Sequence, residues 1–525
     1  MRVGAARTSA ALAVAALTVL SACSVGPSRR PGLAVAGSVA APVTAATTAP
    51  STRPSGPGGA GQQADPVDWQ DCPSSVEPPS AGQSWELQCA EVQVPIDRSV
   101  RNSDTVTVAI SRVRTASTPQ DAPPLLVLLG EPGENGRDDV ARVAAGLDPA
   151  LLAQYSIVTL DVRGTGRPWD ELQCLEDRTI ANLLAPPQSV ADRTSSDLVA
   201  SISKDAVFDC ADTAQNLITD VTTTDVADDL DAIRDAMGVD TVTLFGQGWG
   251  ATVGAVYVDR YPGRVRAAVL DSPSDATATA AEQIGARADA LEAALDAFAA
   301  DCAAAAGGCP LGDDPRTAVE RVVDELGDTG DTGDEFFLTG GSVLLALTTT
   351  LGTPSEWPAL IDALRAAQQG ELAKVEALVT ASVSREDTGD LAQARLEYTC
   401  NDSSIRLTAD DMRSGAAAAV RTAPLFGPFV AGQLGLCSAW PAATAALGRL
   451  SGTGAPPVLV TGSTADPVSP YAGAQAIADQ LSSAILVSWQ AGQHGAVTGS
   501  SCVRKLAIAY LTTGTAPADG RLCPP

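Results

Sequence analysis

The sequence predicts an α/β fold in which a mainly parallel sheet carries helices on both faces and is interrupted by an inserted helical cap. Short apolar runs such as Leu125–Leu129, bounded by Pro124 and Gly130, are typical of strands buried on both faces. These runs alternate with helical patterns, which indicates a parallel sheet. The alternation stops after Asp275 and returns near the C-terminus, so one interrupted sheet domain is the simplest interpretation.

Four strands are expected in the first part of the folded region. Alternating apolar and polar residues predict half-buried strands over Glu91–Ile96 and Thr105–Val113. The buried run Leu125–Leu129 follows, and the next strand, Ser156–Val162, leads into a glycine-containing turn. These elements place the start of the sheet well before the middle of the chain.

A helix is marked clearly over Asp225–Met237, where apolar residues recur at spacings of four, three and four and form one stripe. Thr224 is its expected N-cap, and Gly238 follows as a stop signal. The elements expected next are a strand, a helix and a strand: Thr241–Phe245, Ala251–Tyr261 and Val265–Leu270.

The cap and the C-terminal part have different patterns. From residue 276 to about 435 the chain is rich in Ala and Leu with helical spacing, as between Ala288 and Phe298. Strands and helices then alternate again, and the expected elements are Pro457–Thr461, Tyr471–Leu481, Ala484–Trp489 and Ser501–Leu511. The predicted organisation is a signal peptide (1–23), a tether (24–65), a first core part (66–275), the cap (276–435) and a second core part (436–525).

The N-terminus carries export signals. Arg2 and Arg7 precede the apolar stretch Ala10–Leu20, which is shorter than the roughly 20 residues needed to span a bilayer. The stretch ends in Leu-Ser-Ala-Cys, similar to a bacterial lipobox, so we expect lipidation at Cys23; a plain signal peptide is the alternative. Residues 24–65 are too poor in bulky apolar side chains to fold. The protein is therefore expected to be exported and lipid-anchored at the outer face of the membrane or in the cell envelope, with that lipid as its only membrane contact.

Composition excludes several kinds of partner. The chain of 525 residues has 62 acidic against 34 basic residues and a net charge of -28, which argues against nucleic-acid binding. No cofactor or metal is expected, because the single histidine and the scattered cysteines form no zinc pattern.

The cysteines favour disulfides. Of the 11 cysteines, ten remain besides Cys23, an even number suited to an oxidising compartment. Spacing alone does not fix their connectivity, but pairing of sequence neighbours suggests Cys72–Cys89, Cys174–Cys210, Cys302–Cys309, Cys400–Cys437 and Cys502–Cys523.

The segment Gly246-Gln-Gly-Trp-Gly250, between an expected strand and an expected helix, has the context of a nucleophile elbow. That motif is G-x-S-x-G, and here Gly248 stands where the serine belongs. A dinucleotide fingerprint would need G-x-G-x-x-G, which the spacing does not supply. The other triad members follow in the expected order, because Asp466 and His494 each come just after an expected strand.

The chain resembles secreted actinobacterial tripeptidyl-aminopeptidase-like α/β-hydrolases over nearly all of residues 66–523. The landmarks that carry the resemblance are Cys89 with Val94–Asp97, Gly130–Gly136, Asp161–Arg167, the helix near Thr224, the elbow, Asp466–Val468, His494 and Ser501-Cys502. The resemblance implies an α/β-hydrolase fold, hydrolysis of short peptides, amides or esters, and a cap that restricts access. It also implies a triad at Gly248, Asp466 and His494, with the N–H groups of Glu131 and Trp249 as oxyanion donors.

Two departures bear on activity. Glycine has no side chain, so Gly248 cannot form an acyl-enzyme. The family's loop G-G-P-G-G-S-G reads Gly-Glu-Pro-Gly-Glu-Asn-Gly over residues 130–136. Glu131 or Glu134 could hold a substrate's amino group, although surface carboxylates are the plainer interpretation, and Ser272, Ser274 and Ser469 are expected to be turn or cap residues and not substitute nucleophiles.

Three functional hypotheses follow. The first is a catalytically degenerate homologue that binds a peptide, ester or lipid in a capped pocket. The second is a slow hydrolase in which His494, oriented by Asp466, activates water directly. The third is a structural envelope lipoprotein without a ligand.

Overall fold

The computed structural model describes residues 66–73, 76, 84–100, 102–166, 174–213, 219–327, 331–332, 337–383, 391–443 and 446–525. All of these residues belong to one compact unit, Ser55–Pro525. The expected signal peptide, the lipidation site Cys23 and the tether lie outside the described residues. Among the described helices, none is both long and apolar enough to cross a membrane.

A ten-stranded mixed sheet forms the centre of this unit, in the order β1-β2-β3-β5-β4-β6-β7-β10-β11-β12. In this order, the strands β5, β4, β6, β7, β10, β11 and β12 pair in parallel. Strands β1, β2 and β3 pair antiparallel with their neighbours, including β3 with β5. The bounds are β1 Gln70–Asp71, β2 Trp85–Pro95, β3 Thr105–Thr115, β4 Pro124–Leu128, β5 Ser156–Leu160, β6 Val242–Gln247, β7 Val265–Asp271, β10 Val458–Ser463, β11 Ala484–Trp489 and β12 Arg521–Cys523. This architecture confirms the predicted fold class.

The antiparallel pair β2 and β3 is longer than expected. It is paired from Trp85↔Thr115 to Pro95↔Thr105, whereas the expected strand began only at Glu91. Cys89 and Ala90 are both buried, which breaks the alternation that marks a half-buried strand. The short strand β12 was not expected, because two of its three side chains are exposed.

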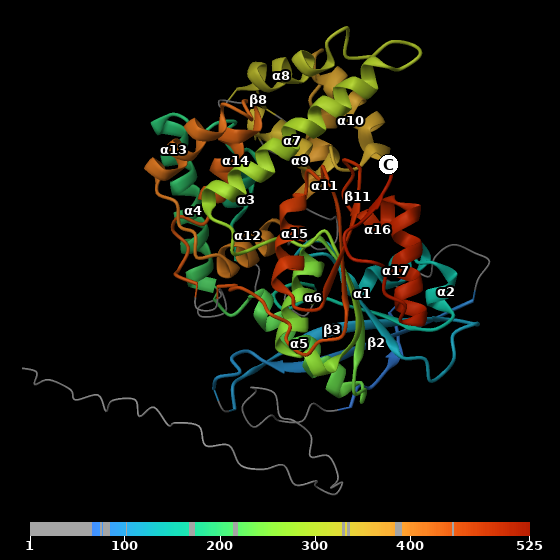
Figure 1. The fold of residues 1–525 in the computed structure, drawn as a ribbon. Helices are drawn as coiled ribbons and strands as arrows, with labels where there is room; N and C mark the ends of the chain where they lie inside the picture. The colour runs from blue at the N-terminus through green and yellow to red at the C-terminus, as the bar shows by residue number, and fades with distance from the viewer. Residues whose placement is uncertain are drawn as a thin grey trace, which may run out of the picture. The chain divides into compact units, whose positions relative to one another are not determined.

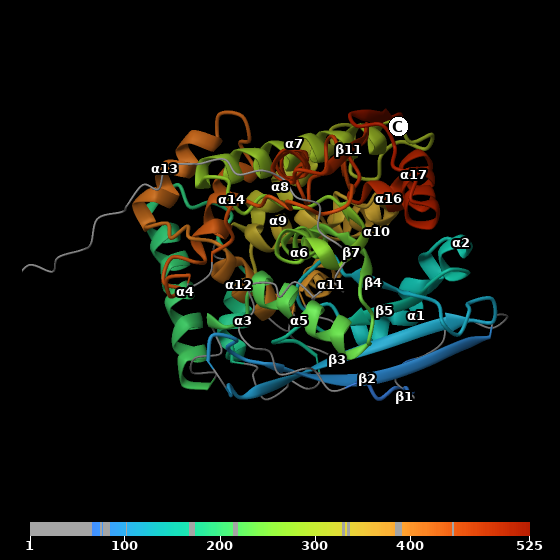
Figure 2. The same cartoon turned by 60° about the horizontal axis from the view of Figure 1, so that its bottom comes forward.

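Helices cover both faces of the sheet (Figures 1 and 2). On one face, α5 (Thr223–Ala236), α6 (Gly248–Arg260) and α15 (Tyr471–Gln480) share a core that includes Leu230 and Tyr257. On the other face, α1 (Gly136–Gly146), α2 (Pro149–Leu152) and α17 (Ser501–Thr513) pack around Val140 and Tyr510. The N-cap of α5 is Thr222, whose side chain accepts from the N–H of Asp225, so the expected cap Thr224 was wrong.

A second, helical core lies beyond the sheet, on the side away from β2 and β3 in both views (Figures 1 and 2). Its elements are α7 Ala280–Ala303, α8 Pro315–Leu326, β8 Asp331–Thr332, β9 Phe337–Leu338, α9 Gly340–Thr350, α10 Trp357–Ala367, α11 Ala373–Val383, α12 Leu391–Asp402, α13 Ala409–Ala419 and α14 Phe426–Gly435, with a 3-10 turn at Pro354–Glu356. Phe298, Phe426 and Phe429 are fully buried at its centre. We call these elements the cap.

Two helices from the earlier part of the chain also pack with the cap. They are α3 (Asp177–Leu184) and α4 (Arg193–Thr213), which supply Leu184 and Val199 to the same apolar core. The cap is therefore built from two separate stretches of the chain.

The structure pairs the ten cysteines as Cys72–Cys89, Cys174–Cys210, Cys302–Cys309, Cys400–Cys437 and Cys502–Cys523. These are the five pairs suggested by sequence neighbourhood. Five disulfides indicate a protein that works outside the reducing cytosol.

A buried ion pair fixes the turn that follows β5. Arg163 donates to both carboxylate oxygens of Asp229, at 2.8 and 2.7 Å, and each side chain is 1% exposed. The same guanidinium donates to the backbone carbonyls of Pro95, Ile96 and Asp220. All the side-chain N–H donors of Arg163 are therefore hydrogen-bonded, and together they link β2, the turn after β5 and α5.

Candidate active site

The elbow lies where β6 ends and α6 begins, as the sequence predicted. Gly248 is the first residue of α6 and has φ +54°, a left-handed angle that glycine adopts without steric cost. A Cβ on Gly250 would lie 2.3 Å from the carbonyl oxygen of Leu129, so only glycine fits there. The elbow's backbone geometry is therefore retained, although the nucleophile is absent.

The space beside Gly248 is filled by the backbone of Gly130. A Cβ on Gly248 would lie 2.7 Å from the carbonyl oxygen of Gly130, closer than real Cβ atoms approach an oxygen. The N–H of Trp249 donates to that same oxygen at 2.7 Å. The loop after β4 thus occupies the place where a serine side chain would begin.

Both expected oxyanion donors are bonded within the protein. Trp249 donates to Gly130, and the N–H of Glu131 donates to the carboxylate of Glu134 at 3.0 Å. An oxyanion hole needs donors that point at the developing negative charge. In this structure the two N–H groups instead donate hydrogen bonds to Gly130 and Glu134.

Asp466 and His494 come together at the carboxyl edge of the sheet, in the expected triad positions. Nδ1 of His494 lies 2.9 and 3.1 Å from the two oxygens of Asp466. Asp466 also accepts from the N–H groups of Val468 and Ser469 and is completely buried, which fixes its position. The N–H of His494 donates to the carbonyl of Gly352, just beyond α9 of the cap.

Neighbouring carboxylates make His494 a cation near neutral pH. Burial alone would lower its pKa, but the charge of Asp466 and its hydrogen bond outweigh burial, with further help from Asp271 and Glu131. Together they raise the pKa of His494 to about 9. A protonated imidazole can donate a hydrogen bond but cannot act as a general base.

Asp271, which the sequence analysis did not single out, supports the histidine loop. It is fully buried at the end of β7 and accepts from Thr461 and from the N–H groups of Ala496 and Val497, at the start of α16 (Ala496–Gly499). Burial raises the pKa of its carboxyl group. The sequence signal that could have indicated Asp271 is its position directly after the predicted buried strand Val265–Leu270.

The alternative serines lie in supporting positions. Ser272 is 1% exposed with φ +58°, the N–H of Ser274 donates to Thr252, and the N–H of Ser469 donates to Asp466. Within the described part of the chain, none of them is hydrogen-bonded to the imidazole of His494.

A cavity of about 390 Å³ lies between the elbow and the cap. Trp249 forms part of its wall, held by a hydrogen bond from its indole to Thr223 and by the ring of Tyr398 at 4.7 Å. Thr223 in turn donates to Asp402 on α12. The residue after the vacant position is thus positioned jointly by the sheet domain and the cap.

Charged groups of the cap also face this cavity. Nε of Arg395 on α12 lies 3.0 Å from the carboxylate of Glu131, and Arg287 on α7 is a further lining residue. Sequence reasoning missed both arginines, because neither lies in a motif.

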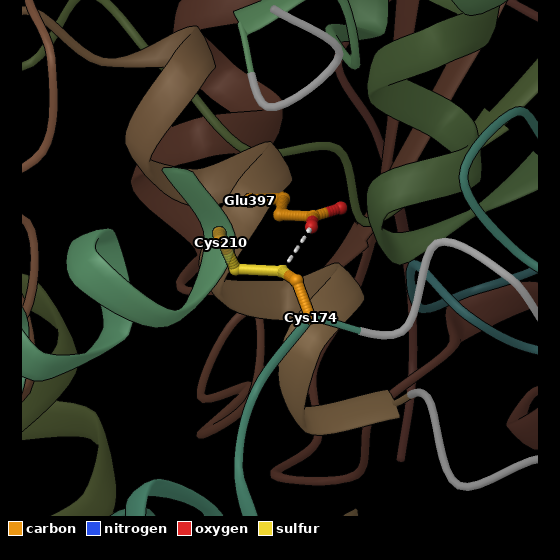
Figure 3. A group of neighbouring side chains, drawn as sticks. All are labelled: Cys174, Cys210 and Glu397. Carbon is orange, nitrogen blue, oxygen red and sulfur yellow. Dashed lines mark hydrogen bonds between the residues drawn. A yellow bond between two sulfur atoms is a disulfide. The ribbon is translucent and has the colours of Figure 1, made fainter. Parts of the chain in front are cut away.

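One cluster of sulfur and acidic groups offers no metal site. Cys174, Cys210 and Glu397 lie close together and are buried, but the two sulfurs form a disulfide, and Glu397 lies 3.8 Å from one of them (Figure 3). Metal ligation requires thiolates. The cluster therefore stabilises the junction of α4 with α12.

Comparison with known proteins places this geometry in a family. The α/β-hydrolase fold model matches residues 123–321, and the model described as TAP-like protein matches residues 423–523. Serine protease Hip1 of Mycobacterium tuberculosis (strain ATCC 25618 / H37Rv) is 30% identical over 478 residues, covering 87% of this chain and 91% of Hip1. The chain belongs to this α/β-hydrolase family.

Other similar proteins are named as different hydrolases. Carboxylesterase B of the same organism is 29% identical, covering 83% of this chain and 86% of that protein. Tripeptidyl aminopeptidase of Streptomyces lividans is 27% identical over 39% of this chain and 38% of that enzyme. A solved proline iminopeptidase from Mycobacterium smegmatis matches 81% of this chain and 98% of its own, at 14% identity and a TM-score of 0.37. By sequence, the chain is thus similar to a named protease and to a named esterase over most of its length.

Proposed function

We propose that this chain is an exported, lipid-anchored hydrolase homologue that no longer performs acyl transfer and instead binds a ligand beneath its cap. The observation that carries the proposal is the filled elbow, in which the carbonyl of Gly130 lies where the serine side chain would begin. Loss of the nucleophile alone costs on the order of 10⁶ in turnover in a serine hydrolase.

The surrounding groups support the same conclusion. An enzyme that had lost only its nucleophile would keep free oxyanion donors, whereas here Trp249 and Glu131 donate to internal acceptors. The alternative of water activated by His494 needs a neutral imidazole. With a pKa of about 9, His494 is mostly protonated at pH 7.

The cavity supports ligand binding over a purely structural role. Its volume of about 390 Å³ falls within the roughly 300–1,000 Å³ of small-molecule sites. The lipobox-like sequence ending at Cys23 would keep this pocket at the outer face of the membrane.

The test treats a family substrate as a ligand. The wild-type protein is titrated with a tripeptide amide by isothermal titration calorimetry. The amide is then recovered, and its mass is determined by mass spectrometry. We expect saturable binding and intact amide. Cleavage of the amide by the wild-type chain would overturn the proposal.

A further inference from the structure

We infer that Arg287 and Arg395 form an anion site inside the cap cavity, which binds the carboxylate of an otherwise apolar ligand. The inference rests on the proposed ligand-binding function and names the chemistry of its ligand. Both arginines come from the cap, on α7 and α12, and both line the cavity above the elbow.

Arg287 is the decisive group because its charge is not matched. Its Nε is shielded from solvent and has no hydrogen-bond partner, and no ion pair involves Arg287 within the described residues. Burial lowers the pKa of Arg287, and the nearby charge of Glu131 only partly offsets this. Arg287 is half-buried, and leaving its shielded Nε–H donor without an acceptor costs stability, so this unpartnered arginine on the cavity wall points to an external anion.

Arg395 adds a second cation that already holds a carboxylate. Its Nε lies 3.0 Å from an oxygen of Glu131, and the charge of Glu131 also acts on Arg287 and on His494. Of these groups only Arg395 contacts Glu131, whereas His494 is already paired with Asp466. Glu131 occupies part of the site as an internal competitor, and the two arginines together carry one positive charge more than this single carboxylate balances.

The remaining acids of the cavity wall are committed elsewhere. Asp402 accepts from the N–H and the hydroxyl of Thr223, and burial raises its pKa to about 7. Asp275 accepts from both the N–H and the hydroxyl of Thr277. Neither is ion-paired with Arg287.

The rest of the wall selects an apolar body. Ile284, Leu345, Leu396, Val430 and Leu434 line the cavity beside the arginines. A guanidinium can bind a carboxylate through two parallel hydrogen bonds, which fixes the orientation of the bound acid. A fatty acid and a short apolar peptide with a free C-terminus share this chemistry.

The test uses the full chain carrying Cys23→Ser, which avoids acylation and hence detergent. Calorimetry compares decanoate with decanol, and acetyl-Ala-Ala-Leu as the free acid with its amide. We expect each bound acid to exceed its neutral counterpart roughly tenfold or more in affinity. A preference for decanoate over decanol would identify the ligand as a fatty acid. A preference for the peptide acid over its amide would identify it as a peptide with a free C-terminus.

Variants assign the preference to the arginines. Arg287→Met should abolish the preference for acids and raise the melting temperature of the free protein, because it removes a shielded N–H donor that has no partner. Glu131→Gln should strengthen acid binding by removing the competitor. Arg365→Met, on an exposed arginine of α10, is the matched control and should change neither property.

Two results would overturn the site. One is equal affinity for acid and neutral probes in the wild type, and the other is an acid preference that survives Arg287→Met. Cleavage of the peptide amide would instead count against the proposed function. In that case the affinities for acid and neutral probes would be compared in the His494→Ala variant.

Discussion

The N–H of Trp249 donates a hydrogen bond to the carbonyl oxygen of Gly130 at 2.7 Å. This contact joins the elbow to the loop that supplies the second oxyanion donor in the family. It requires that residue 248 have no side chain, because the same oxygen lies 2.7 Å from where a Cβ would stand. Loss of the serine and closure of the loop are therefore one structural change.

Restoring the serine should destabilise the protein. In Gly248→Ser the new Cβ meets the oxygen of Gly130, and a non-glycine residue at positive φ adds strain, together about 1–3 kcal/mol. Differential scanning calorimetry should show a lower melting temperature. Gly248→Ala isolates the Cβ from the hydroxyl and should show a similar loss. An unchanged melting temperature in both variants would mean that the loop is not closed in solution.

Reactivity toward a fluorophosphonate should return with the serine and increase when the N–H of Glu131 is freed. Gly248→Ser alone leaves the N–H of Glu131 bonded to Glu134. Adding Glu134→Ala frees that donor, so intact-mass spectrometry should show faster adduct formation in the double variant than in Gly248→Ser. Wild type and the single variant Glu134→Ala are the controls and should gain no adduct at residue 248. Equal rates in the single and double serine variants would remove Glu134 from the account.

The single histidine allows a direct titration. Because His494 is the only histidine in the chain, its ring gives one set of imidazole resonances, and we expect a pKa near 9 by NMR. A folded-state pKa above the ordinary 6.5 means that the bound proton stabilises the fold below about pH 6.5, and that this contribution is lost as the pH rises through about 9. Asp466→Asn should lower the pKa. A wild-type value near 6.5 would make His494 available as a base and reopen the slow-hydrolase hypothesis.

The pair Arg163 and Asp229 should be a major contributor to stability. Breaking a buried ion pair costs about 3–5 kcal/mol, and we expect Arg163→Gln to cost about 3, because Arg98 still contacts Asp229. Urea unfolding gives the free energy directly. Arg142→Gln removes a surface arginine that is 60% exposed, and it should change the free energy by less than about 0.5 kcal/mol. Similar values for the two variants would contradict the assigned role of the buried pair.

Local patterns were sufficient for much of the fold. The parallel strands β4, β5 and β10 are buried along their whole length, and β11 has the expected bounds Ala484–Trp489. The elbow, Asp466 and His494 were predicted because each follows closely on a strand whose pattern is clear. Chain order then brings them to one edge of the sheet.

What the sequence could not show depends on contacts between distant segments. The alternation around Cys89 fails because two consecutive side chains are buried. Helix α4 joins the cap through packing with α13 and α14, and α3 joins it through packing with α11 and α12. The closed oxyanion loop is a backbone contact between Gly130 and Trp249. Gly248 permits this contact, but the residue type alone does not specify it. Arg287 and Arg395 lie on ordinary helices, and only the three-dimensional cavity brings them together.

The most direct test of the central claim is hydrolysis of short-chain esters and fluorogenic tripeptide amides by the wild type beside His494→Ala. The account predicts that the two proteins are indistinguishable from each other and from buffer at pH 7. Turnover by the wild type that disappears in His494→Ala would contradict it, and the chain would then be a hydrolase that works without an elbow nucleophile.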